Sequence, residues 1–364
     1  MDRAPARILF VNHTAGISGP TYSLLMLVRY LRDRYDVAVL LPEEGALCEL
    51  LTNEGVDHFI IPGLRKQTIF KIFQLIHREG FDLVYGNTPS GCSRNAMLAA
   101  KLARKPFIWH IRSMKWNWTW RKSFFLPWAD EIVTVSRACA EPLKRFYPRD
   151  IHIVYNGVEL SSFDVDRVGG RRCLAEQLVL SPDAQYVISV SHLMPRKGYE
   201  QAIAAMAQIV PEMANAHLVV AGRLNDHLDY TDNIRTMIQQ QGLGDHVHLL
   251  GLRTDIPWLL RGSDVFLHTA NSEGHPRVVI EAMAAGLPVV AFAVDGVAET
   301  VVDRETGYLL PLGDVKGMAD AVRSLLEAPA QAAEMGQRGR ERVLTHFTAT
   351  QTAARIAQII EDLL

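Results

Sequence analysis

Short apolar runs alternate along the chain with longer segments in which apolar residues recur at helical spacing. The first run, Ile8 to Val11, leads into a turn at Gly16 to Pro20 and then into a segment whose apolar residues lie on one helical side. Such alternation predicts a parallel sheet with helices on both of its faces. Further runs of this kind are Val37–Leu41, Ile60–Ile61, Leu83–Tyr85, Phe107–Ile111 and Ile132–Val135. The pattern predicts a first Rossmann-like domain that continues to about Val154.

The alternation stops between residues 155 and 184, where glycine, proline, serine and aspartate interrupt any periodicity. We place an interdomain linker here and assign residues 1–165 to a first domain and 166–347 to a second. Strand-like runs resume at Val187–Val190, Leu218–Ala221, Val247–Leu250, Val265–Leu267, Val289–Ala291 and Tyr308–Leu310. They predict a second doubly wound α/β domain. Residues 348–364 carry a helical stripe, Ile356, Ile359, Ile360 and Leu363, which suits a helix that covers either domain.

Composition narrows the class of protein. The chain has 364 residues, of which 48% are hydrophobic and 21% charged, as in soluble proteins with two domains. Its formal net charge of −2 gives no reason to expect a nucleic-acid partner. The N-terminus lacks a signal-peptide pattern, and no apolar run reaches the roughly 18 residues that span a bilayer. The four cysteines have no metal-type spacing, so we expect reduced thiols in a cytoplasmic protein: Cys48, Cys92, Cys139 and Cys173.

The most informative stretch is residues 263–291, SDVFLHTANSEGHPRVVIEAMAAGLPVVA. Two predicted strands enclose a loop and a helix, with Pro276 at the first helical position and Gly286 at the end. Glu273 and Glu281 flank the N-terminus of that helix. Its unpaired N–H groups and positive dipole end suit a phosphate, and a carboxylate early in the helix suits ribose hydroxyls. The stretch therefore predicts a sugar-nucleotide site, although either glutamate alone would be read as a surface residue.

The spacing of Glu273, seven residues and Glu281, followed by Ala282, Met283, Gly286 and Pro288, resembles the signature of family 4 retaining glycosyltransferases. The resemblance implies the GT-B fold, in which two Rossmann-like domains face a central cleft. It implies an N-terminal acceptor domain, a C-terminal nucleotide-sugar domain and a last helix, residues 348–364, that crosses back to the first domain. Ligands of open α/β sheets bind outside the carboxyl ends of the strands, so we expect the chemistry there.

Transfer of a sugar from a nucleoside diphosphate requires cations or N–H groups near the leaving diphosphate. Lys197, in the segment VSHLMPRKG, is the best cation. The segment resembles a family motif with an arginine and, five positions later, a lysine that bind the diphosphate. Here His192 occupies the arginine position. Either Arg196 or a protonated His192 is a replacement for that arginine, and the alternative for Arg196 is a solvated loop charge.

The resemblance assigns further residues to the donor site. They are Gly19 in the glycine-containing turn, Arg223 after the run Leu218–Ala221, Glu299, and the helix start with Pro276, Arg277 and Val278. Each has a structural alternative: the turn needs glycine for its backbone angles, and Glu299 is a capping or surface acid. The segment Asn156 to Val158 matches a family segment at the domain junction, as a hinge or a ligand contact.

His110 ends the strand-like run Phe107–His110, which places it at the mouth of the expected cleft. The family commonly has a histidine there, beside the transferred sugar and the acceptor, whereas a lone histidine at a strand end is often a structural hydrogen-bonder. The resemblance implies front-face attack with Glu273, His110 and Lys197 as catalytic residues and no protein nucleophile. It requires no metal or other cofactor, and we interpret Asp164 and Asp166 as linker acids.

An aromatic and basic segment lies between Trp109 and Trp128. Aromatic and cationic side chains together suit a membrane interface, and aromatic faces also stack on sugars. The alternative is a helix that packs its rings into the first domain. Peripheral membrane contact would use Trp116, Trp118, Trp120, Arg121 and Lys122.

The sequence thus predicts a nucleotide-sugar-dependent hexosyltransferase of polysaccharide biosynthesis, cytoplasmic or at the inner face of the membrane, with a glycan or lipid-linked acceptor. A sugar-nucleotide epimerase or hydrolase on the same fold is the alternative enzyme. A two-lobed sugar-binding protein is the non-enzymatic alternative, but it would normally carry a signal peptide. The donor base, the sugar, the acceptor linkage and the oligomeric state are not predicted.

Overall fold

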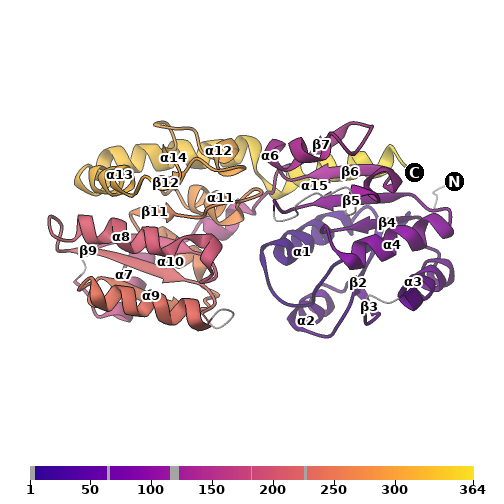
Figure 1. The fold of residues 1–364 in the computed structure, drawn as a ribbon, viewed down its shortest axis with the longest axis horizontal. Helices are drawn as coiled ribbons and strands as arrows, with labels where there is room; N and C mark the ends of the chain where they lie inside the picture. The colour runs from indigo at the N-terminus through magenta and orange to yellow at the C-terminus, as the bar shows by residue number, and fades with distance from the viewer. Residues whose placement is uncertain (1–4, 64–65, 115–122, 182, 225–227) are drawn as a thin grey trace. The chain divides into compact units, whose positions relative to one another are not determined.

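The structure is a computed structural model that describes residues 5–63, 66–114, 123–181, 183–224 and 228–364. The chain forms two compact units (Figure 1). Unit 1 comprises Met1–Gly157 and Ala349–Leu364, and unit 2 comprises Val158–Thr348. The first boundary therefore lies earlier than the predicted one after residue 165.

Unit 1 is built on a parallel sheet. The strands lie in the order β3-β2-β1-β4-β5-β6-β7, and every neighbouring pair is parallel. Their bounds are β1 Arg7–Val11, β2 Asp36–Leu41, β3 Asp57–Ile60, β4 Leu83–Gly86, β5 Phe107–Ile111, β6 Glu131–Thr134 and β7 Ile151–Ile153. All were predicted except β7, a half-buried edge strand of three residues without an apolar run.

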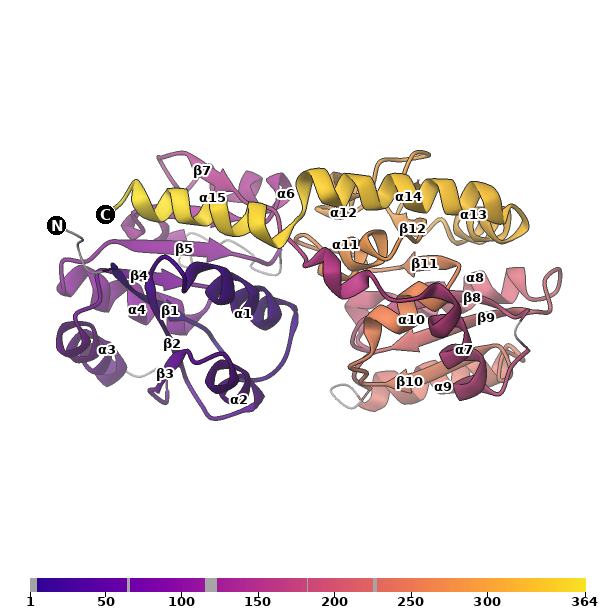
Figure 2. The same ribbon diagram turned by 180° about the vertical axis from the view of Figure 1, so that it is seen from behind.

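Helices cover both faces of this sheet (Figure 2). Ile8 and Phe10 of β1 belong to the core that α1, α2 and α15 cover, whereas Leu9 and Val11 belong to the core under α3 and α4. Successive strand residues point to opposite faces, which explains the continuous apolar runs. The helices are α1 Gly19–Leu31, α2 Ala46–Asn53, α3 Lys66–Glu79, α4 Gly91–Leu102, α6 Arg137–Ala140 and α15 Ala349–Glu361, with 3-10 turns η1 Leu126–Trp128 and η2 Glu141–Leu143.

The C-terminal helix α15 packs on unit 1, as the resemblance implied. Ile356, Ile359 and Ile360 are buried in the same core as α1. The hydroxyl of Tyr35 donates to the carbonyl oxygen of Ala357 at 3.4 Å. The predicted return of the last helix to the first domain is confirmed.

Unit 2 repeats the architecture with strands in the order β10-β9-β8-β11-β12-β13, all parallel. The strands are β8 Gln185–Val190, β9 Ala216–Ala221, β10 Val247–Gly251, β11 Val265–His268, β12 Val289–Phe292 and β13 Gly307–Leu310. The helices are α7 Arg167–Leu178, α8 Tyr199–Ile209, α9 Leu228–Gln240, α10 Ile256–Gly262, α11 Arg277–Ala284, α12 Val297–Thr300, α13 Val315–Glu327 and α14 Pro329–His346, with 3-10 turns η3 Leu160–Phe163 and η4 Pro195–Lys197. The predicted second Rossmann-like domain is confirmed.

The predicted linker between residues 155 and 184 is largely structured. It contains η3 and α7, and α7 packs against α10. A Cβ at Gly170 would lie 2.6 Å from the carbonyl oxygen of Trp258, so glycine here permits close helix packing. Asp166 caps α7 by accepting from the N–H of Gly169 at 2.7 Å, and Asp164 pairs with Arg340. The linker interpretation of these glycines and acids is therefore corrected.

Candidate functional site

The strand order of unit 2 reverses between β8 and β11, which are parallel neighbours. Ligands of open α/β sheets bind at such a switch point, outside the carboxyl ends of the strands. Lys197 ends η4, directly after β8, and Glu273 lies in the loop after β11. The two sites predicted from separate motifs are in contact, because Lys197 Nζ donates to Glu273 Oε1. Arg196 NH1 lies 3.3 Å from the same oxygen.

Backbone contacts hold these two loops together. Thr269 Oγ1 donates to the carbonyl oxygen of Lys197 at 2.9 Å. The N–H of Asn271 donates to the carbonyl oxygen of Arg196 at 2.9 Å. Arg196 NH1 in turn donates to the carbonyl oxygen of Ser272 at 2.6 Å. Gly198, with φ +64°, has no room for a side chain, because a Cβ would lie 2.3 Å from the Thr269 carbonyl oxygen. The loops thus hold Lys197 and Glu273 in a defined geometry.

The electrostatics favour an ionised carboxylate beside two cations. Burial acts to raise the pKa of Glu273, but Lys197, His268 and Arg196 outweigh it and lower the pKa to about 2. Burial lowers the pKa of His268 to about 4, so this neighbour, whose Nε2 is 3.7 Å from Glu273 Oε1, is neutral at pH 7. Lys197 and Arg196 therefore share one carboxylate, and the trio keeps one positive charge for an anionic ligand.

Asp295, which follows β12, completes the loop that carries Glu273. Its Oδ2 accepts from Ser272 Oγ at 2.6 Å and from the N–H of Glu273 at 3.1 Å. Sequence reasoning missed Asp295, Ser272 and His268, because a single polar residue in a loop carries no signal unless its partner is known.

Helix α11 begins one position later than predicted. Pro276 is its N-cap and Arg277 its first residue. Arg277 NH2 donates to Glu281 Oε1 at 3.3 Å, one helical turn later, and both side chains are mostly buried. Glu281 and the half-buried Val278 thus lie in the first turns of the helix after Glu273, as predicted.

The other predicted donor-side residues lie in neighbouring turns of unit 2. His192 follows β8 and Arg223 follows β9, and both are half-buried. The N–H of Leu193 donates to the carbonyl oxygen of Arg223 at 2.9 Å, which brings these two turns together. Glu299 lies on α12, where its carbonyl oxygen accepts from Arg342 NH2 at 3.0 Å. The ligand roles of these side chains stay predictions.

In unit 1 the structure buries His110 completely. The hydroxyl of Tyr85 lies 2.5 Å from His110 Nδ1. Burial, and then the charge of Arg112, hold the pKa of His110 well below its usual range. Its Nε2 makes no hydrogen bond to any described residue. The result is a neutral imidazole with one nitrogen in contact with Tyr85 and one buried nitrogen that has no hydrogen bond to a described residue.

The switch point of unit 1 lies between β1 and β4. Asn87, after β4, donates to Asn12 Oδ1 at 3.1 Å and accepts from Arg112 Nε at 2.8 Å. Arg112 NH1 also donates to Asn156 Oδ1 at 2.8 Å. This buried network was not predicted, apart from Asn156. Gly19 is the first residue of α1, so the predicted glycine-containing turn does lead into a helix N-terminus at this edge.

The aromatic segment divides into three parts. Trp109 is a core residue whose Nε1 donates to the Thr88 carbonyl oxygen at 3.0 Å. The proposed membrane residues Trp116, Trp118, Trp120, Arg121 and Lys122 lie outside the described residues. Phe124 and Trp128 follow them and are exposed.

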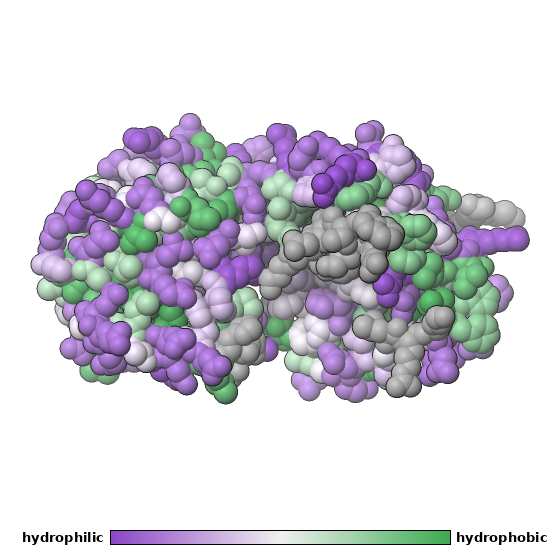
Figure 3. Space-filling model, viewed as in Figure 1, coloured by the Kyte–Doolittle hydropathy of each residue, from purple (hydrophilic) through white to green (hydrophobic). Residues whose placement is uncertain are grey.

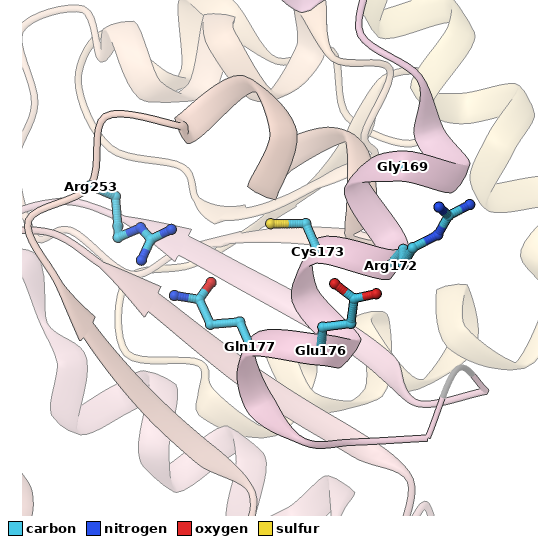
Figure 4. A pocket seen from close by; sticks show the side chains of 6 residues that line it. All are labelled: Gly169, Arg172, Cys173, Glu176, Gln177 and Arg253. Atoms are coloured by element: carbon cyan, nitrogen blue, oxygen red, sulfur yellow. The ribbon is translucent and has the colours of Figure 1, made fainter.

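A depression of about 470 Å³ lies beside α7 in unit 2 (Figure 4). Its lining residues are Gly169, Arg172, Cys173, Glu176, Gln177 and Arg253. Arg253 already pairs with Asp255 at 2.5 Å. None of the predicted site residues lines this depression, so it does not enter the functional argument.

Two family models match the chain in succession. One described as Glycosyltransferase Family 4 matches residues 17–162, and one described as Glycosyl transferases group 1 matches residues 172–342. The second match includes Lys197, Glu273 and Glu281. Together the two models cover nearly the whole chain in the expected domain order.

The curated relatives agree with these two family models. A lipopolysaccharide core biosynthesis mannosyltransferase of Rhizobium meliloti is 27% identical over 58% of this chain and 61% of its own length. In three further relatives the match spans 47–57% of their length, so the chain spans about half of several proteins that it resembles. UDP-Gal:alpha-D-GlcNAc-diphosphoundecaprenol alpha-1,3-galactosyltransferase of Escherichia coli is 23% identical over 91% of this chain and 90% of its own length.

Solved structures share the fold. Anabaena HepE in complex with UDP and glucose has a TM-score of 0.90 at 24% identity, covering 98% of this chain and 100% of HepE. A glycosyltransferase from Rickettsia africae has a TM-score of 0.89 at 18% identity, covering 99% and 98% of the two chains. The predicted fold class, two Rossmann-like domains of the GT-B type, is thereby confirmed.

Proposed function

We propose, since this chain belongs to glycosyltransferase family 4, that it transfers a sugar from a nucleoside-diphosphate sugar to a hydroxyl group of a glycan or lipid-linked glycan, with retention of anomeric configuration. The observation that carries the proposal is the cluster of the half-buried Lys197 and Arg196 with the buried Glu273 at the switch point of unit 2. Its remaining positive charge suits a leaving diphosphate.

Each residue has a defined part in the proposed reaction. Lys197 and Arg196 hold the diphosphate and offset the negative charge that grows as its bond to the sugar breaks. Glu273 orients the sugar and stabilises the positive charge that develops on it. Glu281 accepts hydrogen bonds from the ribose hydroxyls. The leaving diphosphate takes the acceptor proton, so no side chain acts as a nucleophile.

His110 contributes from unit 1 in this proposal. Its neutral state, and an Nε2 atom without a hydrogen bond to any described residue, support a hydrogen bond to the transferred sugar or to the acceptor. Tyr85 holds the ring by its contact with Nδ1. A histidine held in one orientation binds a hydroxyl without a reorganisation cost.

The proposed chemistry uses side-chain cations in place of a metal ion. Lys197 and Arg196 already supply two positive charges where a diphosphate would lie. We therefore expect sugar transfer to persist when EDTA removes divalent ions. A loss of activity of more than about tenfold that added Mg²⁺ or Mn²⁺ restores would contradict this expectation.

The acceptor proposed here is a lipid-linked glycan at the inner face of the cytoplasmic membrane, in polysaccharide biosynthesis. The Escherichia coli relative, which aligns with most of the chain, carries an undecaprenol-linked acceptor in its name and supports this proposal. No helix among the described residues has the length and apolar character of a membrane span. Contact with the bilayer would therefore be peripheral.

Exposed aromatic side chains of unit 1 support such contact. Phe124 and Trp128 are exposed, with ring centroids 6.4 Å apart, and lie next to the basic aromatic segment. Phe70 on α3 is also exposed and stacks on Phe73 at 6.0 Å. Figure 3 shows hydrophobic residues gathered over α3 and α4. The described side chains of these helices include one acid, Glu79, and the bases Lys71, Arg78, Arg94 and Lys101, a balance that suits anionic lipid.

Vesicle sedimentation tests this surface. We expect the protein to bind phosphatidylglycerol vesicles more tightly than neutral phosphatidylcholine vesicles, and a Phe70→Ser, Trp128→Ser variant to bind about tenfold more weakly, because two apolar anchors are lost. Leu344→Ser, an exposed apolar residue on α14 of unit 2, is the control. Equal binding by the variant and the control would show that α3 and η1 do not contact the bilayer.

A thermal-shift panel of UDP-, GDP-, ADP- and dTDP-sugars tests the proposed function. We expect one nucleotide class to raise the melting temperature, because a ligand that binds only the native state stabilises it. In calorimetry with that donor, Glu281→Ala should bind at least several-fold more weakly, since the ribose loses an acceptor. Glu327→Ala, an exposed control on α13, should bind normally.

Two outcomes would contradict the proposal. The first is that no donor at millimolar concentration changes the melting temperature. The second is full donor turnover without any acceptor, which would favour the epimerase or hydrolase alternative.

A further inference from the structure

The backbone of Glu273 is held on both sides by the turn after β12. The Asp295 carboxylate accepts from the Glu273 N–H at 3.1 Å and from Ser272 Oγ at 2.6 Å. The N–H of the next residue, Gly296, donates to the Glu273 carbonyl oxygen at 3.0 Å. Both backbone polar groups of Glu273 are therefore bonded to the Asp295–Gly296 turn.

The Asp295–Gly296 turn combines a left-handed backbone at Asp295 with a close approach of Gly296 to the Glu273 loop. Asp295 has φ +39°, although it is not glycine. A Cβ at Gly296 would lie 1.8 Å from the Gly274 carbonyl oxygen, so the two loops touch backbone to backbone. Strained backbone persists where the surrounding contacts over-determine it, and such residues cluster at functional sites.

The Asp295 carboxylate acts here as a hydrogen-bond acceptor. Within the described residues it forms no ion pair, and both of its contacts lie on the segment Ser272–Glu273. The same segment is bonded on its other side by Arg196, which donates to the Ser272 carbonyl oxygen at 2.6 Å. Asp295 and Arg196 thus hold the Glu273 loop from the ends of β12 and β8, the two strands that flank β11.

We propose that Asp295 is a positioning residue of sugar transfer, which holds the carboxylate of Glu273 at the place where the donor sugar binds. This inference rests on the proposed function and extends it to a residue that does not touch the substrate. A carboxylate displaced by about 1 Å from the reacting sugar loses much of its catalytic effect. Thr269 bonds the backbone of Lys197 through its carbonyl oxygen, so we expect the diphosphate contacts of Lys197 to persist without Asp295.

Three substitutions test which property of the Asp295 contact matters: the acceptor oxygen, the negative charge or the donor on Ser272. Asp295→Gly removes the acceptor and relieves the positive φ, so the turn itself is retained. Asp295→Asn keeps an acceptor oxygen and removes the charge. Ser272→Ala removes one of the two donors. Arg304→Gly is the control for the backbone change, because Arg304 is an exposed residue of unit 2 that also has a positive φ, 62°.

The first measurement uses the donor identified in the thermal-shift panel and its free nucleoside diphosphate. For Asp295→Gly we expect kcat/KM to fall about 10- to 100-fold, mainly in kcat, while the Kd of the nucleoside diphosphate stays within about twofold. Ser272→Ala should lose less, and Asp295→Asn and Arg304→Gly should stay within about threefold. A general loss of structure would instead weaken diphosphate binding as well.

The second measurement is independent of catalysis. The rate at which acetic anhydride modifies Lys197 is followed by mass spectrometry, with the exposed Lys316 as the internal reference. Lys197 is shielded by its contact with Glu273, so we expect Asp295→Gly to raise its relative rate about threefold or more. Asp295→Asn should restore the slow rate.

The outcomes distinguish the two proposals. If the wild-type protein transfers sugar but Asp295→Gly keeps kcat within about twofold, with unchanged Lys197 modification, the positioning role is overturned. If the wild-type protein binds no nucleotide sugar, the proposed function fails, and the modification rate alone decides whether Asp295 holds the Glu273 loop.

Discussion

Replacement of Glu273 by glutamine is expected to lower kcat/KM for sugar transfer about 100-fold or more, because it removes a negative charge from the place where positive charge develops. Glutamine has nearly the same shape, so Lys197 keeps a hydrogen-bond partner. The carboxylate has a pKa of about 2 and is ionised at every working pH. Steady-state kinetics with the identified donor and acceptor measure the loss.

The same variant should bind the free nucleoside diphosphate as tightly as the wild type, or more tightly. Lys197 and Arg196 then have no carboxylate to neutralise, so their full charge faces the diphosphate. Glu327→Gln on α13 is the control for the substitution itself. Activity within about threefold of the wild type would remove Glu273 from the reaction and, with it, the main support for the proposed mechanism.

Acid should destabilise unit 2 strongly. Burial is the main cause that lowers the pKa of His268 to about 4 and of His275 to about 3, from an ordinary value of 6.5. Between pH 6.5 and 4 the unfolded chain binds protons at these histidines and the folded chain does not. Stability is therefore unaffected above pH 6.5 and falls as the pH drops below it, by about 4 kcal/mol for the two residues together at pH 5.

Thermal melts between pH 7.5 and 5 check this expectation. His268→Gln, which cannot take up a proton, should reduce the pH dependence of the melting temperature, since one of several histidines with a lowered pKa is removed, while His110, His248 and His275 keep their contributions. His77→Gln, an exposed residue of α3, should leave it unchanged. A melting temperature that is constant over this range would show that the two histidines are not held neutral in the folded protein.

The candidate donor site in unit 2 could be predicted because its sequence signals lie within short stretches of the chain. Pro276, Glu281 and Gly286 mark a helix that starts directly after the Glu273 loop, and the flanking strands are continuous apolar runs. Lys197 was found in the same way, from its place between a strand and a helix. That Lys197 and Glu273 touch also follows in part, because parallel strands have their carboxyl ends at one edge.

Other features depend on contacts between distant residues. Asp295 bonds to Glu273 only because their loops follow the neighbouring strands β11 and β12, and the sequence does not state which strands are neighbours. The burial of His110 depends on Tyr85 from β4 and on the helices above the sheet. Residues around Gly170 were interpreted as a linker, since close helix packing and a flexible turn both use glycine.

By itself, the sequence determined most of the strands, the class of fold and the donor motif, because each of these follows from the spacing of a few residues along the chain. Only the tertiary structure decided the boundary at residue 157, the buried state of His110 and the partners of Glu273. The physical reason is that burial and hydrogen bonding depend on which residues are close in space. Strand order and loop geometry determine these neighbours.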